Sequence, residues 1–171
     1  MGLFTKKPLT KESYLSFITS YKGIMYKIAY GYLSSEADSM EALDEAVYLG
    51  YAKLRQLKDP EALKSWVTRI LINECYRMLR NRKKEIPAEQ LPEVKAEETE
   101  TSMTVKNAVE NLPEELKEII ILRYFADYSV KDTATFLDLP QGTVATRSRK
   151  TLELLKEDLI SMEGGMQHES I

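Results

Sequence analysis

Residues 139–154 read LPQGTVATRSRKTLEL, and this stretch decides the fold. Pro140 and the Gln-Gly pair after it end one helix and begin another. In the next helix, four residues recur at steps of four, four and three, which places them on one face. This spacing predicts a buried face made of Val144, Ser148, Leu152 and Leu155. Thr146, Arg149 and Lys150 fall on the opposite face. A buried stripe opposite a basic one suits insertion into a DNA major groove, so the sequence predicts the second half of a helix-turn-helix.

Amphipathic helical patterns fill most of the remaining chain, and no segment shows a convincing strand pattern. Three long helices are predicted over 11–33, 35–57 and 60–84, with Ser35 and Asp59 as N-caps of the second and third. The apolar stripe of the second is Met40, Leu43, Val47, Tyr51 and Leu54. Shorter helices are predicted from about residue 103 to before Leu112-Pro113, over 114–125, and from a cap at Ser129 to Leu137. The predicted fold class is therefore all-α.

Composition divides this helical chain into two small domains, 10–84 and 103–160, joined by a linker over 85–102. The linker stretch from Glu85 to Thr101 holds two prolines, no aromatic residue, six glutamates and one lysine. Sparse hydrophobicity with charge of one sign is typical of a flexible acidic linker. A solvated tether with no further role explains it as well as any specific function does.

Several classes of function are disfavoured by composition. The single cysteine, Cys75, and the single histidine, His168, exclude an intrachain disulfide and a Cys/His zinc cluster. No stretch approaches the ~20 apolar residues of a membrane span, and the N-terminus lacks a signal-peptide core, which predicts a cytoplasmic protein. We expect no metal, no cofactor and no catalytic residue. The net charge of −3 is unusual for a protein that binds DNA unaided, because counterion release needs a basic surface. Either the basic residues are segregated or a partner assists.

A second basic surface lies on the helix predicted over 60–84. Helical spacing places five residues of this surface within ~80° of the helix circumference, as one stripe: Arg69, Asn73, Arg77, Arg80 and Lys84. Tyr76 lies beside the stripe, and both it and Asn73 can contact bases as well as phosphates. A merely solvated charged face is the usual explanation of such a stripe. Trp66, at its edge, suits the core better than an unstacked base.

The helix predicted over 35–57 carries an acidic surface made of Asp38, Glu41, Asp44 and Glu45. Acids near a helix N-terminus are often simply solvated and favoured by the helix dipole. Paired carboxylates also occur in acid–base catalysis, but no histidine, Gly-rich loop or nucleophile motif accompanies them. Acids beside Tyr48 fit docking onto a basic protein surface better.

These pieces, in this order, resemble an extracytoplasmic-function (ECF) sigma factor, a small bacterial RNA polymerase sigma subunit of the sigma-70 family. The resemblance covers most of residues 12–158. It is carried by the acidic helix DSMEALDEAVYLGYAKL, by SWVTRILINECYRMLRNRKK, and by two strings in the C-terminal half. These strings run from Leu112-Pro113 to Leu122-Arg123-Tyr124 and from Pro140 to Arg147.

The resemblance implies a transcription initiation factor that brings core RNA polymerase to specific promoters. Contacts with the β′ clamp helices and the β flap are implied, the clamp contact by way of Glu41, Asp44, Glu45 and Tyr48. Recognition of the opened −10 element is expected from Lys58, Asp59, Thr68, Arg69, Asn73, Tyr76, Arg77 and Arg80. Recognition of the −35 duplex is expected from Thr143, Thr146, Arg147, Arg149 and Lys150. The family further implies an anti-sigma factor, often membrane-bound, that holds the protein inactive.

Four positions depart from the family pattern. Asp44 replaces the usual Gln, Arg77 a common Asp, Ala145 a frequent basic residue and Ser148 a Leu on the buried stripe. The main rival function is that of a stand-alone helix-turn-helix regulator, which would bind duplex DNA without polymerase. A helical enzyme that uses the carboxylates is a second rival, and a protein-interaction adaptor that no longer binds DNA is a third. Retained Arg147, Arg149 and Lys150 argue against the adaptor.

Overall fold

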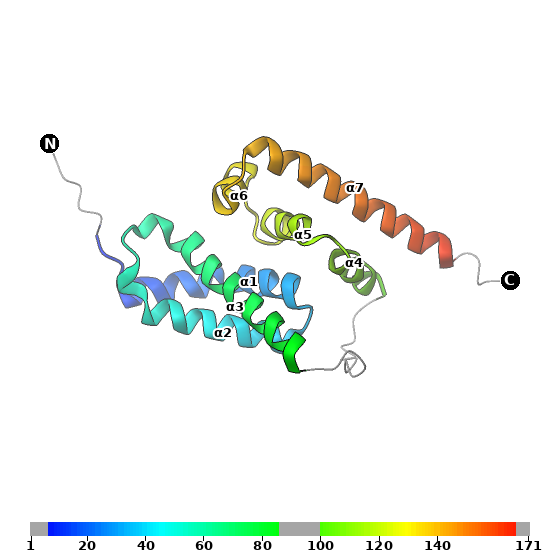
Figure 1. The fold of residues 1–171 in the computed structure, drawn as a ribbon. Helices are drawn as coiled ribbons and strands as arrows, with labels where there is room; N and C mark the ends of the chain where they lie inside the picture. Colours follow the sequence, from blue (N-terminus) through cyan, green and yellow to red (C-terminus); the bar gives the residue numbers. More distant parts are fainter. Residues whose placement is uncertain (1–6, 86–99, 167–171) are drawn as a thin grey trace. The chain divides into compact units, whose positions relative to one another are not determined.

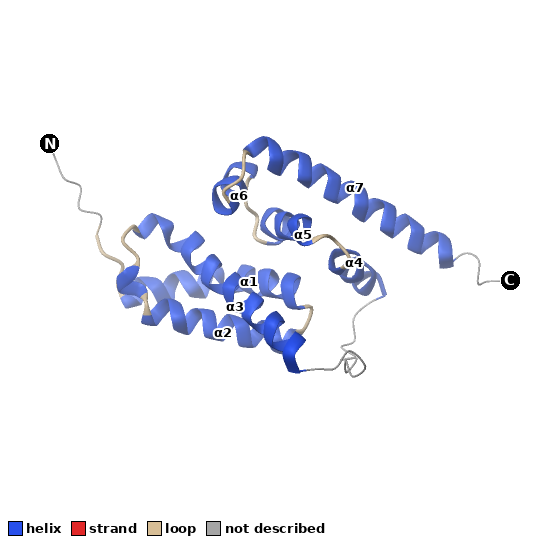
Figure 2. Cartoon of the chain, viewed as in Figure 1, coloured by secondary structure: helices blue, strands red, loops and turns tan. Residues whose placement is uncertain are grey.

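The computed structural model describes residues 7–85 and 100–166, which form only helices and connecting turns (Figures 1 and 2). The N-terminal part holds α1 (Lys11–Leu33), α2 (Glu36–Ala52) and α3 (Leu63–Glu85), with 3₁₀ turns at Leu54–Gln56 and Pro60–Ala62. The C-terminal part holds α4 (Glu100–Glu110), α5 (Glu114–Ile120), α6 (Val130–Leu137) and α7 (Gln141–Met166). A π-helical turn, Ile121–Phe125, follows α5 directly. The predicted all-α class is confirmed.

The chain forms two compact units, Met1–Pro92 and Glu93–Ile171. The division falls inside the segment predicted as an acidic linker, of which residues 86–99 lie outside the described part. Glu85 ends α3, and α4 begins at Glu100, so both borders of that segment are helical.

In the first unit, each of the three long helices packs against the other two (Figure 1). The apolar stripes predicted from spacing meet at the centre, where burial of aliphatic and aromatic surface stabilises the bundle. Side chains with no exposed surface come from all three helices: Tyr14, Met25, Ile28 and Ala29 of α1, Ala42 and Ala46 of α2, and Val67, Leu71 and Cys75 of α3.

α1 and α2 approach each other closely at Gly50. The fully buried Tyr14 donates its hydroxyl hydrogen to the Val47 carbonyl oxygen at 2.8 Å. A Cβ at position 50 would overlap that hydroxyl, so only glycine leaves room for the ring. Burial raises the pKa of Tyr14 to about 12, because the phenolate would lose its hydration there.

Short polar side chains begin the helices where the sequence predicts them. Ser35 accepts the backbone N–H of Asp38, and Ser129 accepts that of Asp132, as N-caps of α2 and α6. α1 begins with a reciprocal capping box between Thr10 and Ser13, which helical spacing alone does not reveal.

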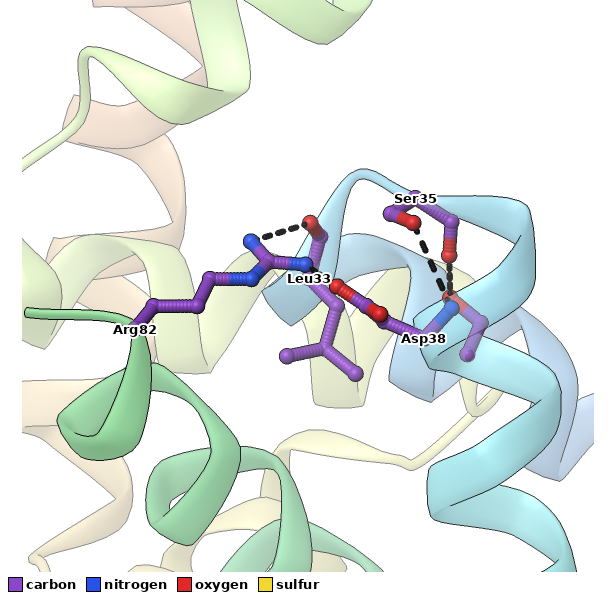
Figure 3. A network of polar contacts seen from close by, with 5 residues as sticks. Leu33, Ser35, Asp38 and Arg82 are labelled. Atoms are coloured by element: carbon purple, nitrogen blue, oxygen red, sulfur yellow. Dashed lines mark hydrogen bonds and ion pairs between the residues drawn. The ribbon is translucent and has the colours of Figure 1, made fainter. Parts of the chain in front are cut away.

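Arg82, near the end of α3, ties the other two helices of the unit together (Figure 3). Its guanidinium donates to the Leu33 carbonyl oxygen at 3.2 Å, at the C-terminus of α1. It also pairs with the carboxylate of Asp38 in the first turn of α2 (Figure 3). One cation thus satisfies the negative end of one helix and an acid at the start of the next.

Two predictions about the α2 segment are wrong. α2 ends at Ala52 rather than near Leu57, and Leu54 is buried from the following 3₁₀ turn. Met40, predicted on the buried stripe, is 46% exposed. The buried face of α2 is made instead by small residues, Ser39, Ala42, Ala46 and Gly50, together with Leu43. The centre of this face lies ~100° around the helix from Met40, which is therefore exposed.

The second unit packs α4, α5 and α6 against α7. One part of its core consists of Ile119 of α5, Ala134 of α6 and Val144 of α7, with Val130, Leu137 and Leu139 packed around them. α6 ends at Asp138, whose φ of 54° is left-handed, and the N–H of Leu139 donates to the Ala134 carbonyl oxygen at 2.9 Å. This tight turn leads straight into α7 at Gln141, which confirms the predicted helix-turn-helix.

Four consecutive residues, Ile119 to Leu122, are buried where α5 passes into the π-helical turn. The N–H of Ala126 donates to the carbonyl oxygen of Ile121, five residues earlier, at 2.9 Å. An α-helix spreads four successive side chains around ~300° of its circumference. Their burial therefore needs cover from several sides, which α7 supplies to α5 and α6 supplies to the π-helical turn.

Candidate nucleic-acid and protein interfaces

The acidic side chains of α2 share one face with an aromatic ring. Glu41 and Asp44 are exposed, Glu45 is half-buried, and Tyr48 is 65% exposed. Helical spacing places the four within ~100° of one another. They form the acidic face, a name used below for Glu41, Asp44, Glu45 and Tyr48. A negative patch with an exposed ring suits a cationic protein surface.

The basic stripe that the sequence predicts on α3, which also includes Arg77 and Lys84, is exposed along its whole length. Arg69, Asn73 and Arg80 are exposed and lie within ~40° on the helix. We call these three residues the α3 basic face. Lys58 and Asp59 are exposed in the loop that precedes α3. The carboxylate of Asp59 accepts the N–H of Glu61 at 3.1 Å, so it holds the loop as an N-cap.

The prediction that Thr68 faces DNA is wrong. Its side chain has no exposed surface, and its hydroxyl donates to the Lys64 carbonyl oxygen at 2.7 Å. The same hydroxyl lies 2.9 Å from the hydroxyl of Tyr21 in α1. Thr68 therefore joins α1 to α3, where a buried hydroxyl needs these partners.

Tyr76 and Arg77 lie at opposite edges of the exposed side of α3, each turned to a neighbouring helix. The half-buried Tyr76 packs edge-on against Tyr32 of α1, with ring centroids 5.4 Å apart. Arg77 donates from Nε to Oε2 of Glu74 at 2.8 Å, on the side of α3 next to α2. Trp66 is half-buried, which is compatible both with packing in the core and with contact to an unstacked base. Arg77 is thus exposed, as predicted, but is paired with Glu74, whereas Tyr76 is partly covered by α1.

The N-terminal half of α7 carries the other cationic face. Thr146, Arg149 and Lys150 are exposed, as predicted, and form the α7 basic face. Thr143 and Arg147 are half-buried. The guanidinium of Arg147 lies 3.3 Å from the carboxylate of Glu115 in α5, so its charge is partly committed within the unit. Sequence reasoning missed this partner, because no spacing rule links α5 to α7.

Known proteins match both units. Residues 17–85 match sigma-70 region 2, and residues 102–155 match sigma-70 region 4. RNA polymerase sigma factor SigV of Bacillus subtilis (strain 168) is 30% identical over 164 residues, which cover 90% of this chain and 98% of that protein. The ECF RNA polymerase sigma factor SigW of the same organism is 23% identical over 168 residues, covering 87% and 90%.

The chain belongs to the ECF sigma factors of the sigma-70 family. It is accordingly a transcription initiation factor that directs RNA polymerase to promoters. The fold agrees with a solved ECF-type structure, the sigma factor RpoE of Bartonella quintana in complex with the anti-sigma factor NepR. That chain gives a TM-score of 0.66 at 22% identity, with 84% of this chain and 96% of that one covered.

α7 of this sigma factor differs from the prediction at one buried position. Leu152 is 44% exposed, and Thr151 is buried in its place beside Val144 and Ser148. Two steps of four residues rotate a side chain ~80° from its starting face, whereas a step of seven rotates it only ~20°. Thr151 satisfies its hydroxyl on the Arg147 carbonyl oxygen at 2.7 Å. Among the described residues, the buried Ser148 hydroxyl has no hydrogen-bond partner.

The described parts of this sigma factor hold no group of three or more His, Cys, Asp or Glu side chains arranged for a metal ion. None of their helices is both long enough and apolar enough to cross a membrane.

Proposed function

We propose that the two units recognise one promoter at two places while α2 holds the polymerase. The α3 basic face takes the non-template strand of the opened −10 element, and the α7 basic face enters the −35 major groove. The acidic face docks on the polymerase β′ clamp helices, and the second unit contacts the β flap. The observation that carries this proposal is the presence of one exposed cationic helix face on each compact unit.

The −35 assignment is supported by the orientation of α7. Val144 and Thr151 are fully buried on one side, while Thr146, Arg149 and Lys150 are exposed on the other. Arg149→Ala is expected to weaken −35 recognition by about 1–3 kcal/mol if the guanidinium reads a base edge. Lys156→Ala, an exposed cation farther along the same helix, is the matched control. Equal loss across unrelated −35 sequences would assign Arg149 to a phosphate instead.

The −10 assignment is supported by Asn73 lying between two exposed arginines on one helix face. Holding an extruded base offsets an unstacking cost of a few kcal/mol, so this contact belongs to promoter opening rather than to polymerase binding. Asn73→Ala is expected to reduce promoter opening, measured by permanganate reactivity of −10 thymines, with core binding near normal. Asn81→Ala changes the same residue type at an exposed position outside the face. Unchanged opening in Asn73→Ala would remove Asn73 from the −10 site.

The polymerase assignment is tested by a paired charge change on α2. Glu41→Gln combined with Glu45→Gln is expected to weaken binding to core RNA polymerase, most strongly at low salt. Glu36→Gln removes an exposed acid from the opposite side of α2 and serves as the control. Equal affinities of all three proteins would show that the acidic face does not dock.

The net charge of −3 favours polymerase-dependent action, because a free acidic protein gains little from counterion release on DNA. Run-off transcription is expected only when core enzyme and this chain are both present. The proposed place of action is the cytoplasm. A gel shift separates this function from the stand-alone regulator, which would bind the duplex equally well without core enzyme.

An anti-sigma factor is proposed as a further partner, in view of the Bartonella relative bound to NepR. Covering the acidic face and the α7 basic face would block both polymerase docking and −35 recognition. Whether such a partner sits at the membrane stays a prediction. Pull-down from the native cell, with core polymerase as competitor, tests it: a true anti-sigma factor is displaced by core enzyme.

A further inference from the structure

Arg77 and Glu74 form an ion pair at the seam between α2 and α3. Nε of Arg77 lies 2.8 Å from Oε2 of Glu74, one turn earlier on α3. The Glu74 side chain is only 10% exposed, whereas that of Arg77 is 46% exposed. Burial fixes the carboxylate, and the guanidinium extends from it to the surface. The position of Arg77 is therefore set by a buried anchor rather than by a flexible surface contact.

α3 packs directly against α2, and the charges of Glu45 and Glu41 on α2 act on the exposed end of this pair. The hydrogen bond and charge of Glu74 raise the pKa of the Arg77 guanidinium above its usual range, and the charges of Glu45 and Glu41 on α2 raise it further. Arg77 thus carries its full positive charge within the field of two acids that we assign to polymerase docking. A cation fixed there lowers the negative potential that those acids present to an approaching partner.

We propose that Arg77 is an internal counter-ion of the acidic face and weakens the binding of this sigma factor to core RNA polymerase. The inference rests on the proposed docking role of that face. Arg77 competes with the cationic groups of the polymerase for Glu41 and Glu45, and it sets both the affinity and its salt dependence. It acts through those acids and is not itself a DNA contact.

The first test is Arg77→Gln in the full chain, with the dissociation constant for core RNA polymerase measured between about 0.1 and 0.5 M salt. Glutamine still donates a hydrogen bond to Glu74 but removes the charge. We expect binding about 3-fold tighter at the low-salt end and equal at the high-salt end, because two unit charges several ångströms apart interact by a fraction of a kcal/mol in water. Lys27→Gln removes the same net charge from an exposed position on α1 and is expected to leave affinity unchanged.

A second comparison avoids leaving the buried Glu74 carboxylate without a cation. Glu74→Gln alone is compared with Glu74→Gln/Arg77→Gln, since two amides can pair with each other at this site. Removing Arg77 is expected to tighten core binding here as well. In a chain that also carries Glu41→Gln and Glu45→Gln, the gain is expected to disappear, because the acids on which Arg77 acts are gone.

The outcomes separate this inference from the docking assignment. If the two acid substitutions weaken binding but removing Arg77 leaves it unchanged or weaker in both comparisons, Arg77 is not a counter-ion of the face. A gain that persists without Glu41 and Glu45 would also overturn it, because Arg77 would then act elsewhere. If the acid substitutions themselves have no effect, the docking assignment fails first. A Lys27→Gln gain equal to that of Arg77→Gln would reduce the effect to net charge.

Discussion

Replacing Arg82 with alanine is expected to destabilise the three-helix unit by about 2 kcal/mol. The hydrogen bond from its guanidinium to the Leu33 carbonyl oxygen is charge-assisted and part-buried, worth about 1 kcal/mol. The ion pair with Asp38 joins side chains that are 36% and 30% exposed, so solvent screening limits it to about 0.5–1 kcal/mol. Loss of both also leaves the end of α1 without this cation.

The chain supplies its own reporter for this measurement. Trp66 is the only tryptophan and lies in α3, so its fluorescence follows unfolding of the first unit within the intact protein. With a urea dependence of about 1–3 kcal/mol per molar, the loss should lower the unfolding midpoint by roughly 1 M. Lys83→Ala, the neighbouring exposed cation, is expected to change stability by less than ~0.5 kcal/mol.

A double-mutant cycle with Asp38→Asn gives the coupling directly, expected at about 0.5–1 kcal/mol. The reasoning is refuted if Arg82→Ala unfolds at the wild-type midpoint but binds promoter DNA more weakly. Arg82 would then belong with the DNA-facing cations, as the run of basic residues at the end of α3 suggests on its own.

Three further outcomes follow from buried groups. Gly50→Ala is expected to cost about 1–3 kcal/mol, because the new Cβ would overlap the Tyr14 hydroxyl; an unchanged urea midpoint would contradict that close approach. Ser148→Ala is expected to stabilise the second unit by about 1 kcal/mol by removing a buried hydroxyl without a partner among the described residues, and faster amide exchange in α7 would argue the opposite. Burial, helped by the charge of Glu74, raises the pKa of the Cys75 thiol from 9.0 to about 12, so a thiol reagent at pH 8 should label it only on unfolding. Because the unfolded thiol ionises first, stability should fall as pH rises from 9.0 towards about 12, and Cys75→Ala should flatten that fall; rapid native labelling would rule out this burial.

Helix positions were largely predictable because caps and periodicity are local properties. The predicted 11–33 helix matches α1, and Ser35 and Ser129 begin α2 and α6 as expected. The exposed positions Asn73 and Arg149 also follow from helical spacing alone. The sequence could therefore identify the helices and most of the outward-facing candidates.

What spacing could not supply is the identity of the neighbour beside each position. Thr68 and Arg69 are adjacent in sequence, yet Thr68 is buried, with its hydroxyl beside that of Tyr21, whereas Arg69 is exposed. Arg77 lies only ~40° from Asn73 on α3, but Glu74 and the acids of α2 give it a different environment. Met40 is exposed because the buried face of α2 is built mainly from small residues, which the apolar pattern did not count, and is centred ~100° away from it. Each error concerns packing between helices. The spacing of residues along one helix shows which of them share a face, but not which other helix lies against that face.

The π-helical turn at Ile121–Phe125 holds one residue more than an α-helical turn needs for the same span. Removing one residue there would let the turn close as an ordinary α-helix, and the helix-turn-helix that follows would keep its place relative to α5. A deletion inside α5, where no extra residue can absorb it, would instead rotate everything after it by about 100° and draw it back by about 1.5 Å. One-residue deletions a few positions apart should therefore have opposite consequences for the DNA-facing side chains of α7.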